Sequence, residues 1–228
     1  MKTQVKPALP LEEAPFFREV SSRLRARIEN YVYHREYEPR QIVFFPDDPC
    51  DRVYWVHRGR VKIATVRSDR RELTYRYLLA GDMFGEECLI KSAKRDAYAE
   101  AVEPSVLCLM SAADFRRIVR DEKEISLMVA KWLCRRVGDV EETLAECVFK
   151  SVRSRVASGL LRLHQRAPQK ENGRIRITHQ EIASLVGSTR ETTTAVLHRL
   201  QREGMVAIGN RHVTLLDPVA LQRVARSG

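Results

Sequence analysis

The 228-residue sequence lacks the usual features of secreted, membrane-spanning and enzymatic proteins. Its five cysteines are odd in number and scattered, without a CxxC pair, so neither a disulfide framework nor a zinc ribbon is expected. No apolar run approaches the roughly 20 residues of a membrane helix, and the first ten residues lack the apolar stretch of a secretory signal. We therefore expect a cytoplasmic protein without membrane contact.

Catalytic and metal-binding motifs are also missing. The chain contains no nucleophile elbow, HExxH, P-loop or dinucleotide-binding fingerprint, so an enzyme is not expected. His34 and His57 are isolated in the sequence and show no metal-ligand spacing, so no metal site is predicted. Cys88 and Cys108 lie in apolar, strand-like segments, where we expect them to be core residues.

Positive charge is concentrated in the last third of the chain. Residues 151–228 hold 13 Lys and Arg against 5 Asp and Glu, a net charge of +8, whereas residues 1–150 carry only +2. Such a segment can neutralise phosphates and release condensed counterions, although a solvated basic surface has the same composition. Nucleic acid is therefore one candidate partner.

Short strand-like segments occupy the sequence from Ile42 to about Met110. They are rich in β-branched and aromatic residues and are separated by glycine and proline turn signals. Many short strands at this spacing predict a β barrel or jelly roll, which we assign to residues 1–121 together with a helical segment before the strands.

A long helix is predicted from about Glu122 to Phe149, within a dimerisation segment of residues 122–150. Apolar residues recur in it at steps of 3, 4, 3, 4 and 3, which is typical of a two-stranded coiled coil; packing on the chain's own barrel is the alternative. The predicted dimer seam consists of Ala130, Leu133, Val137, Val140, Leu144 and Cys147.

Residues 151–228 show the pattern of a winged helix-turn-helix. Thr178 and Glu181 form a capping box at the start of one helix, which ends at Gly187. A second helix runs from Arg190 to about Arg202, and Gly209-Asn210 joins two short strands as a wing. The predicted fold is therefore α+β: a jelly-roll effector domain, a dimerisation helix and a carboxy-terminal winged helix-turn-helix.

In a helix-turn-helix the first turn of the second helix enters the major groove of duplex DNA. Arg190, Glu191 and Thr194 are the predicted base-contacting residues, since arginine can bond guanine and glutamate can accept from cytosine. The alternative is that Arg190 and Glu191 are ordinary surface charges. The predicted phosphate-contacting residues are Thr178, Gln180, Thr189, Thr192, Arg211 and His212.

The segment THQEIASLVGSTRETTTAVLHRL resembles the DNA-binding signature of the cyclic-AMP receptor protein/fumarate-nitrate regulator superfamily. The order of barrel, long helix and winged helix resembles this superfamily over about residues 15–220. The resemblance implies a homodimeric regulator, an activator on palindromic DNA with RNA polymerase as a partner. Arg190 and Glu191 match two base-reading positions of the family, whereas Ala195 stands at the third. We therefore expect a related half-site with altered specificity at that position.

The segment GDMFGEECLIKSAKRDAYAEAV resembles the family's phosphate-binding cassette. The resemblance implies that Glu86 meets a ribose hydroxyl, that Arg95 meets a cyclic phosphate and that backbone N–H groups near Gly85 help to hold it. Asp96 replaces the usual hydroxyl residue, and a carboxylate there would repel a phosphodiester. Arg95 and Asp96 as a surface ion pair is the alternative.

Val140 and Glu141 occupy the helix positions where hydroxyl side chains of the family reach adenine. Together with Asp96, they argue against cyclic AMP and leave the effector unassigned, including the case of no effector. A cyclic-nucleotide-responsive signalling module that acts on protein partners is the alternative function, and the basic carboxy-terminal region argues against it.

Overall fold

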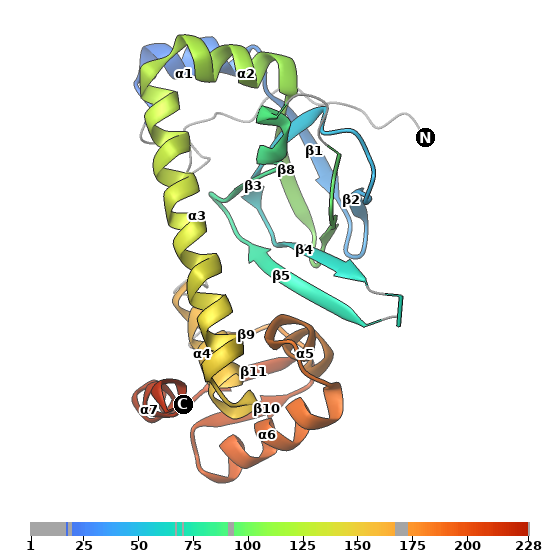
Figure 1. The fold of residues 1–228 in the computed structure, drawn as a ribbon, viewed down its shortest axis with the longest axis vertical. Coiled ribbons are helices and arrows are strands. Elements are labelled where there is room, and N and C mark those ends of the chain that lie inside the picture. Colours follow the sequence, from blue (N-terminus) through green and yellow to red (C-terminus); the bar gives the residue numbers. More distant parts are fainter. Residues whose placement is uncertain are drawn as a thin grey trace. The chain divides into compact units, whose positions relative to one another are not determined.

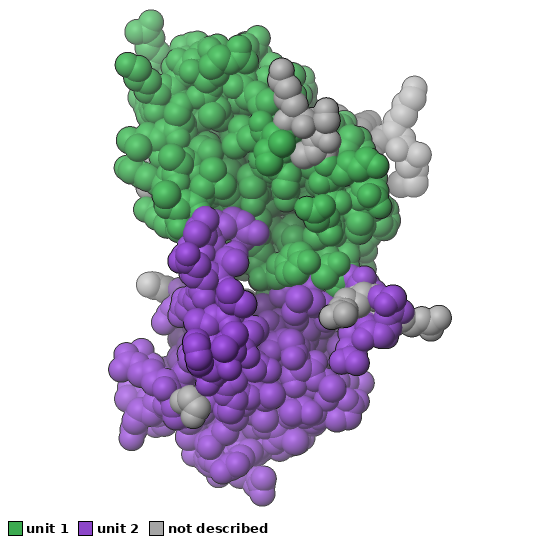
Figure 2. Space-filling view, viewed as in Figure 1, with its two compact units in different colours: residues 1–65, 75–135 green, residues 66–74, 136–228 purple. Residues whose placement is uncertain are grey.

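The computed structural model describes residues 17, 20–66, 68–69, 71–90, 94–166 and 173–227. The chain divides into two compact units, residues 1–65 with 75–135 and residues 66–74 with 136–228 (Figure 2). The first unit is a β-sandwich with helices, and the second contains a helix-turn-helix with a small sheet (Figure 1). The predicted α+β class is confirmed. No described helix is long and apolar enough to cross a membrane.

Two four-stranded sheets form the sandwich, in the orders β1-β8-β3-β6 and β2-β7-β4-β5. Neighbouring strands run antiparallel wherever their register is defined, for example β1 with β8 and β4 with β7. The strands are β1 (Tyr33–Tyr37), β2 (Ile42–Phe44), β3 (Arg52–Arg58), β4 (Val61–Val66), β5 (Glu72–Leu78), β6 (Met83–Phe84), β7 (Tyr98–Ala101) and β8 (Ser105–Ser111).

Strand β3 is buried on both faces, which explains its continuous apolar run from Val53 to Val56. Because side chains alternate along a strand, Tyr54 and Val56 point into the core between the two sheets. Trp55 points the other way, into a second core that the sheet shares with helices. These helices are α1 (Ser22–Glu29), α2 (Ala112–Asp121) and the first part of α3 (Lys123–Phe149).

Strand β1 differs from the sequence-based prediction, which began the strands at Ile42 and expected only a helical segment before them. Helix α1 ends at Glu29, and Tyr33–Tyr37 pair with Ser105–Leu109 of β8. His34 and Tyr37 are both buried, and because they are three residues apart they point to opposite faces of the strand. The long-range pairing with β8 therefore decides the structure of this segment.

The second unit contains the end of α3 and a three-stranded sheet of order β10-β11-β9. The wing turns at Asn210-Arg211 and not at Gly209-Asn210, because Gly209 pairs with His212. A last helix was not predicted, although Asp217 caps it and Pro218 is its first residue. The elements are α4 (Val152–Arg166), β9 (Arg174–Ile175), α5 (His179–Val186), α6 (Arg190–Arg202), β10 (Val206–Gly209), β11 (His212–Leu215) and α7 (Pro218–Arg226).

Candidate nucleic-acid interface

The capping box predicted at the start of α5 is present. The Thr178 hydroxyl accepts from the Glu181 N–H at 3.2 Å, and the Glu181 carboxylate accepts from the Thr178 N–H at 2.7 Å. Gly187 ends α5 with φ of 62°, a left-handed conformation that glycine adopts without strain. These local interactions fix both ends of α5 and hence the turn that leads into α6.

Helix α6 is fixed by one buried face. Thr193, Leu197 and Leu200 are fully buried, and the Thr189 hydroxyl caps the helix by accepting from the Thr192 N–H at 3.1 Å. Arg190 and Glu191, in the first turn, are exposed on the other side. An arginine and a glutamate at an exposed helix start can both reach the edges of bases in a groove.

Thr194 differs from the other two predicted base contacts. Its side chain is half-buried, and its hydroxyl lies 2.9 Å from Nδ1 of His179 on α5. Burial, and secondarily the neighbouring His198 and Arg190, lowers the pKa of His179, which favours the neutral form of its ring. Thr194 thus also contributes to α5–α6 packing, and any contact with a base stays a prediction.

The residues predicted to contact phosphates lie on the helix-turn-helix and the wing. Gln180 and Arg211 are exposed, whereas the Thr178 and Thr189 hydroxyls already serve as helix caps. The Thr192 hydroxyl lies 3.0 Å from that of Thr189. The half-buried His212 has its Nδ1 atom 3.2 Å from an Arg174 nitrogen, so the positive charge of Arg174 on β9 lies beside the wing. Arg174 was not among the residues predicted from the sequence.

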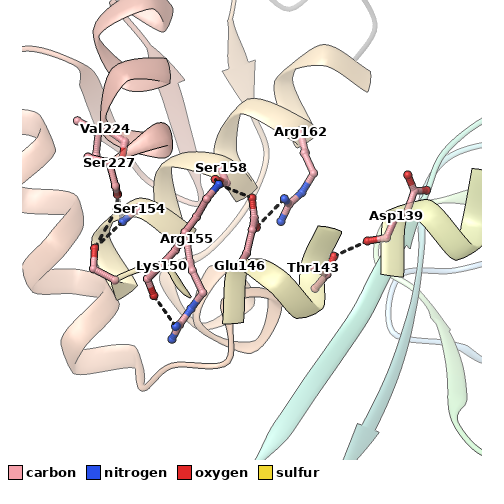
Figure 3. Close-up of polar contacts among 11 residues, drawn as sticks. Asp139, Thr143, Glu146, Lys150, Ser154, Arg155, Ser158, Arg162, Val224 and Ser227 are labelled. Carbon is pink, nitrogen blue, oxygen red and sulfur yellow. Dashed lines mark hydrogen bonds and ion pairs between the residues drawn. The ribbon is translucent and has the colours of Figure 1, made fainter. Parts of the chain in front are cut away.

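A buried carboxylate connects the last turns of α3 to α4 (Figure 3). Glu146 Oε1 lies 2.9 Å from Lys150 Nζ, and its Oε2 lies 2.7 Å from Arg162 Nη1. Lys150 Nζ also donates to the Ser158 hydroxyl at 3.1 Å. This carboxylate was not among the residues predicted from the sequence, although the Glu146–Lys150 spacing of four residues was a signal for the pair.

Helix α4 is also hydrogen-bonded to the helix-turn-helix and to the end of the chain. Arg155 donates from Nε to the Val186 carbonyl and from Nη1 to the Lys150 carbonyl, both at 3.0 Å. Ser154 donates to the Ser227 carbonyl, next to α7 (Figure 3). The end of α3, helix α4 and the carboxyl end of α5 are therefore joined by side-chain hydrogen bonds within the second unit.

The predicted effector pocket is partly filled by its own side chains. Arg95 is 2% exposed; its Nη1 lies 2.8 Å from Glu87 Oε2 and its Nη2 donates to the Arg52 carbonyl. Its guanidinium also lies over the Phe44 ring, 4.4 Å from the centroid. Gly85 allows this approach, since a Cβ there would lie 3.0 Å from Arg95 Nη1.

The expected surface ion pair between Arg95 and Asp96 is wrong. Arg95 is buried while Asp96 is exposed, and Glu87 is the carboxylate that pairs with Arg95. Glu86, expected to meet a ribose, is paired with Arg76 at 3.1 Å. Residues 91–93 of the cassette lie outside the described residues.

Val140 and Glu141 lie on α3 in the second unit, and both are exposed. The predicted dimer seam is exposed over most of its length: the exposed fractions of Val137, Val140 and Leu144 are 57%, 53% and 63%. Ala130 and Cys147 are exposed as well, but Leu133 packs against the core beneath α1 and α2. The alternative of packing on the chain's own barrel therefore holds for Leu133 and for the start of α3.

The histidines are not isolated in space. Cys88 and Cys108 are fully buried, as predicted. However, His34, His57 and Cys108 lie together, with one potential ligand atom from each within 4.8 Å of the others. The sequence analysis missed this group because it did not predict strand β1, which carries His34.

The fold and the site define a DNA-binding transcription regulator of the winged helix-turn-helix type. The sequence profile of the family described as "Cyclic nucleotide-binding domain" matches residues 34–122, and that of the "Crp-like helix-turn-helix domain" matches residues 154–224. A "CRP-like cAMP-activated global transcriptional regulator" of Mycobacterium tuberculosis is 31% identical over 95% of this chain and 98% of its own. The chain belongs to the CRP/FNR family of transcription regulators, which are not enzymes.

Solved structures of family members have the same fold. A CRP-family regulator of Thermus thermophilus is 30% identical with a TM-score of 0.74, over 85% of this chain and 97% of its own. A c-di-GMP-responsive global regulator of Xanthomonas campestris is 27% identical with a TM-score of 0.75, over 86% and 99%. The relative from Mycobacterium tuberculosis is thus named for cyclic AMP and the one from Xanthomonas campestris for c-di-GMP.

Replacing Glu146 by Gln is expected to lower the free energy of unfolding at pH 7 by about 1–3 kcal/mol, because Lys150 and Arg162 lose their buried partner. Burial alone would raise the pKa of Glu146, but hydrogen bonds from Arg162 and Lys150 bring it below the ordinary value of 4.5. The Glu146 contribution is thus present above pH 4.5 and is lost as the pH falls through the lowered pKa.

Urea denaturation of the full chain at one protein concentration, at pH 7 and near pH 3.5, measures this effect. The difference between the wild type and Glu146→Gln is expected to shrink at the lower pH. Glu142→Gln, an exposed position on the same helix, is the matched control and should change little at either pH. An equal destabilisation by Glu146→Gln at both pH values would contradict the ionic role of Glu146.

Proposed function

We propose that this protein is a homodimeric activator that binds a two-fold symmetric operator and inserts the first turn of α6 into the major groove. The observation that carries the proposal is the exposed Arg190-Glu191 pair at a capped helix start whose opposite face is fully buried. The basic charge of residues 151–228 supports it, because phosphate contacts supply much of the affinity of such proteins for DNA. Recruitment of RNA polymerase is the expected route to activation in this family.

Arg190, Glu191 and Ala195 have distinct roles in this proposal. Arg190 donates two hydrogen bonds to O6 and N7 of a guanine, and Glu191 accepts from N4 of a cytosine. Ala195 is also exposed but has no polar group, so it can distinguish only the thymine methyl from the other bases by an apolar contact. The operator half-site is therefore expected to contain G·C pairs, with weaker selection at the base pair that faces Ala195.

The substitution Arg190→Ala is expected to cost about 1–3 kcal/mol of binding free energy on the preferred operator and much less on unrelated DNA. Glu191→Ala is expected to relax the preference at one base pair. Fluorescence anisotropy with operator duplexes that carry single base changes measures both effects, at a fixed and stated salt concentration.

Arg202→Ala is the matched control for Arg190→Ala, because Arg202 is an exposed arginine in the last turn of the same helix. It removes the same charge but is expected to leave the base preference unchanged. If Arg190→Ala weakened binding to every sequence equally, Arg190 would hold a phosphate instead, and the assignment of its base contact would be wrong.

Dimerisation is proposed to occur through the second half of α3. Val137, Val140 and Leu144 are all more than half exposed in the single chain, and they repeat at the spacing of a coiled-coil seam. Exposed apolar residues that are aligned in this way typically mark a surface that another helix covers. Cys147, also exposed, continues the same seam.

Leu144→Asp is expected to dissociate the dimer, because it places two carboxylates in the apolar seam, one from each chain. Sedimentation velocity over a concentration series should show at least a tenfold increase in the dissociation constant. Ala145→Asp is the matched control, since it adds the same charge at an exposed position one residue outside the seam. A monomeric wild-type protein, or equal dissociation by both variants, would contradict this interface.

DNA binding is proposed not to depend on cyclic AMP. Arg95, which would hold the cyclic phosphate, is already paired with Glu87 and stacked on Phe44. A cyclic nucleotide would have to break these contacts, and it could shift the protein towards DNA binding only if it bound that form more tightly. The relative from Mycobacterium tuberculosis is named for cyclic AMP and that from Xanthomonas campestris for c-di-GMP, so effectors differ within the family.

Cyclic AMP is therefore expected to change the operator affinity of the wild type less than threefold. Operator titrations with and without saturating cyclic AMP measure the change. Glu87→Gln, which removes the carboxylate that neutralises Arg95, is expected to bind cyclic AMP more tightly than the wild type does. A gain of tenfold or more in operator affinity for the wild type would contradict the proposed independence.

A further inference from the structure

Three adjacent strands bring two histidines and a cysteine to the face of the sheet that packs against the helices. His34 of β1 and Trp55 of β3 both lie opposite Cys108 of β8 in the strand register. The register of β3 shifts between Val56 and Arg58, which places a bulge at His57. His57 comes two residues after Trp55 in the same strand, and its imidazole lies close to the other two side chains.

The three side chains are close enough to bind one ion. The Cys108 sulfur lies 3.1 Å from Nε2 of His34, and the two imidazole rings are 5.9 Å apart and nearly perpendicular. One potential ligand atom from each residue lies within 4.8 Å of the others. A tetrahedral ion with bonds of about 2.0–2.3 Å holds its ligand atoms roughly 3–4 Å apart, so small rotations of the side chains suffice.

We propose that His34, His57 and Cys108 form a binding site for one transition-metal ion of the zinc class. Two imidazoles and a thiolate are ligands that Zn²⁺ prefers, and a water molecule would complete the tetrahedron. Cys108 and His34 are buried, while His57 is half-buried and is the member of the group that is partly exposed to solvent. This is the one such group found among the residues that the structure describes.

Without an ion, the Cys108 thiol is expected to be protonated. Burial raises the pKa of the Cys108 thiol to about 12. Burial, and secondarily the neighbouring His57, lowers the pKa of His34. Binding of Zn²⁺ forms a bond from the ion to the cysteine sulfur and one to each imidazole, and the thiol proton is released to solvent. The ion thus replaces a proton, and the site gains one net positive charge.

A thiol–imidazole hydrogen bond between Cys108 and His34 is the alternative explanation of their contact. It involves two of the three residues, whereas a bound ion would also engage His57, which lies beside them. A bound ion would link β1, β3 and β8 directly, so it would stabilise the sheet that carries the core residues Val53 and Trp55.

Titration of the purified full-length protein with cobalt(II) chloride tests the site, because cobalt(II) occupies zinc sites and gives visible absorption when it binds thiolate. The wild type is expected to bind one cobalt ion per chain with a sulfur-to-cobalt charge-transfer band, and zinc chloride should displace it. His57→Gln and Cys108→Ser are each expected to weaken cobalt binding by at least tenfold. His57 is half-buried, so His57→Gln remains informative if Cys108→Ser fails to fold.

Cys134→Ser is the matched control, since this cysteine is exposed on α3 and lies outside the proposed dimer seam. It should retain the charge-transfer band and the affinity of the wild type. The site would be refuted if the wild type gave no such band, if the band survived in His57→Gln and Cys108→Ser, or if Cys134→Ser lost it. The result does not depend on operator binding, so it is separable from the proposed function.

Discussion

Burial of one face of α6 is the constraint on which the proposed mechanism depends. Thr193, Leu197 and Leu200 are completely enclosed, so the helix cannot rotate about its axis without exposing apolar surface. The Thr189 cap and the left-handed Gly187 then determine where the helix begins. The direction of Arg190 and Glu191 follows from this packing. Their fixed exposure can give sequence recognition, because hydrogen bonds to bases need defined geometry.

Helix α4 connects the helix-turn-helix, which contains α6, to the end of α3. Arg155 joins it to the carboxyl end of α5, and Glu146 joins it to α3 through Arg162 and Lys150. These bonds are made by charged groups that are partly removed from water, where such bonds are stronger than neutral ones. If α3 pairs with the α3 of a second copy, the same bonds would hold the DNA-binding elements of both chains in a two-fold symmetric arrangement.

Features with local signals could be predicted from the sequence. The Thr178–Glu181 capping box, the Gly187 turn and the long α3 are specified by residues a few positions apart, and the structure contains all three. Features that depend on contacts between distant segments could not be predicted from the sequence. Strand β1 exists because it pairs with β8, about 70 positions away, and the His34–His57–Cys108 group depends on that pairing. The partner of Arg95 is Glu87, eight positions away, and not the adjacent Asp96, so sequence proximity alone gave the wrong partner.

Selection of bound duplexes from a random DNA pool by the full-length protein tests the central claim most directly. The account predicts an enriched two-fold symmetric sequence whose G·C-containing half-sites are centred about 10 base pairs, or a multiple of this, apart. It also predicts that the G·C preference disappears when the selection is repeated with Arg190→Ala. A pool without enriched symmetry, or the same motif with both proteins, would contradict recognition by the first turn of α6.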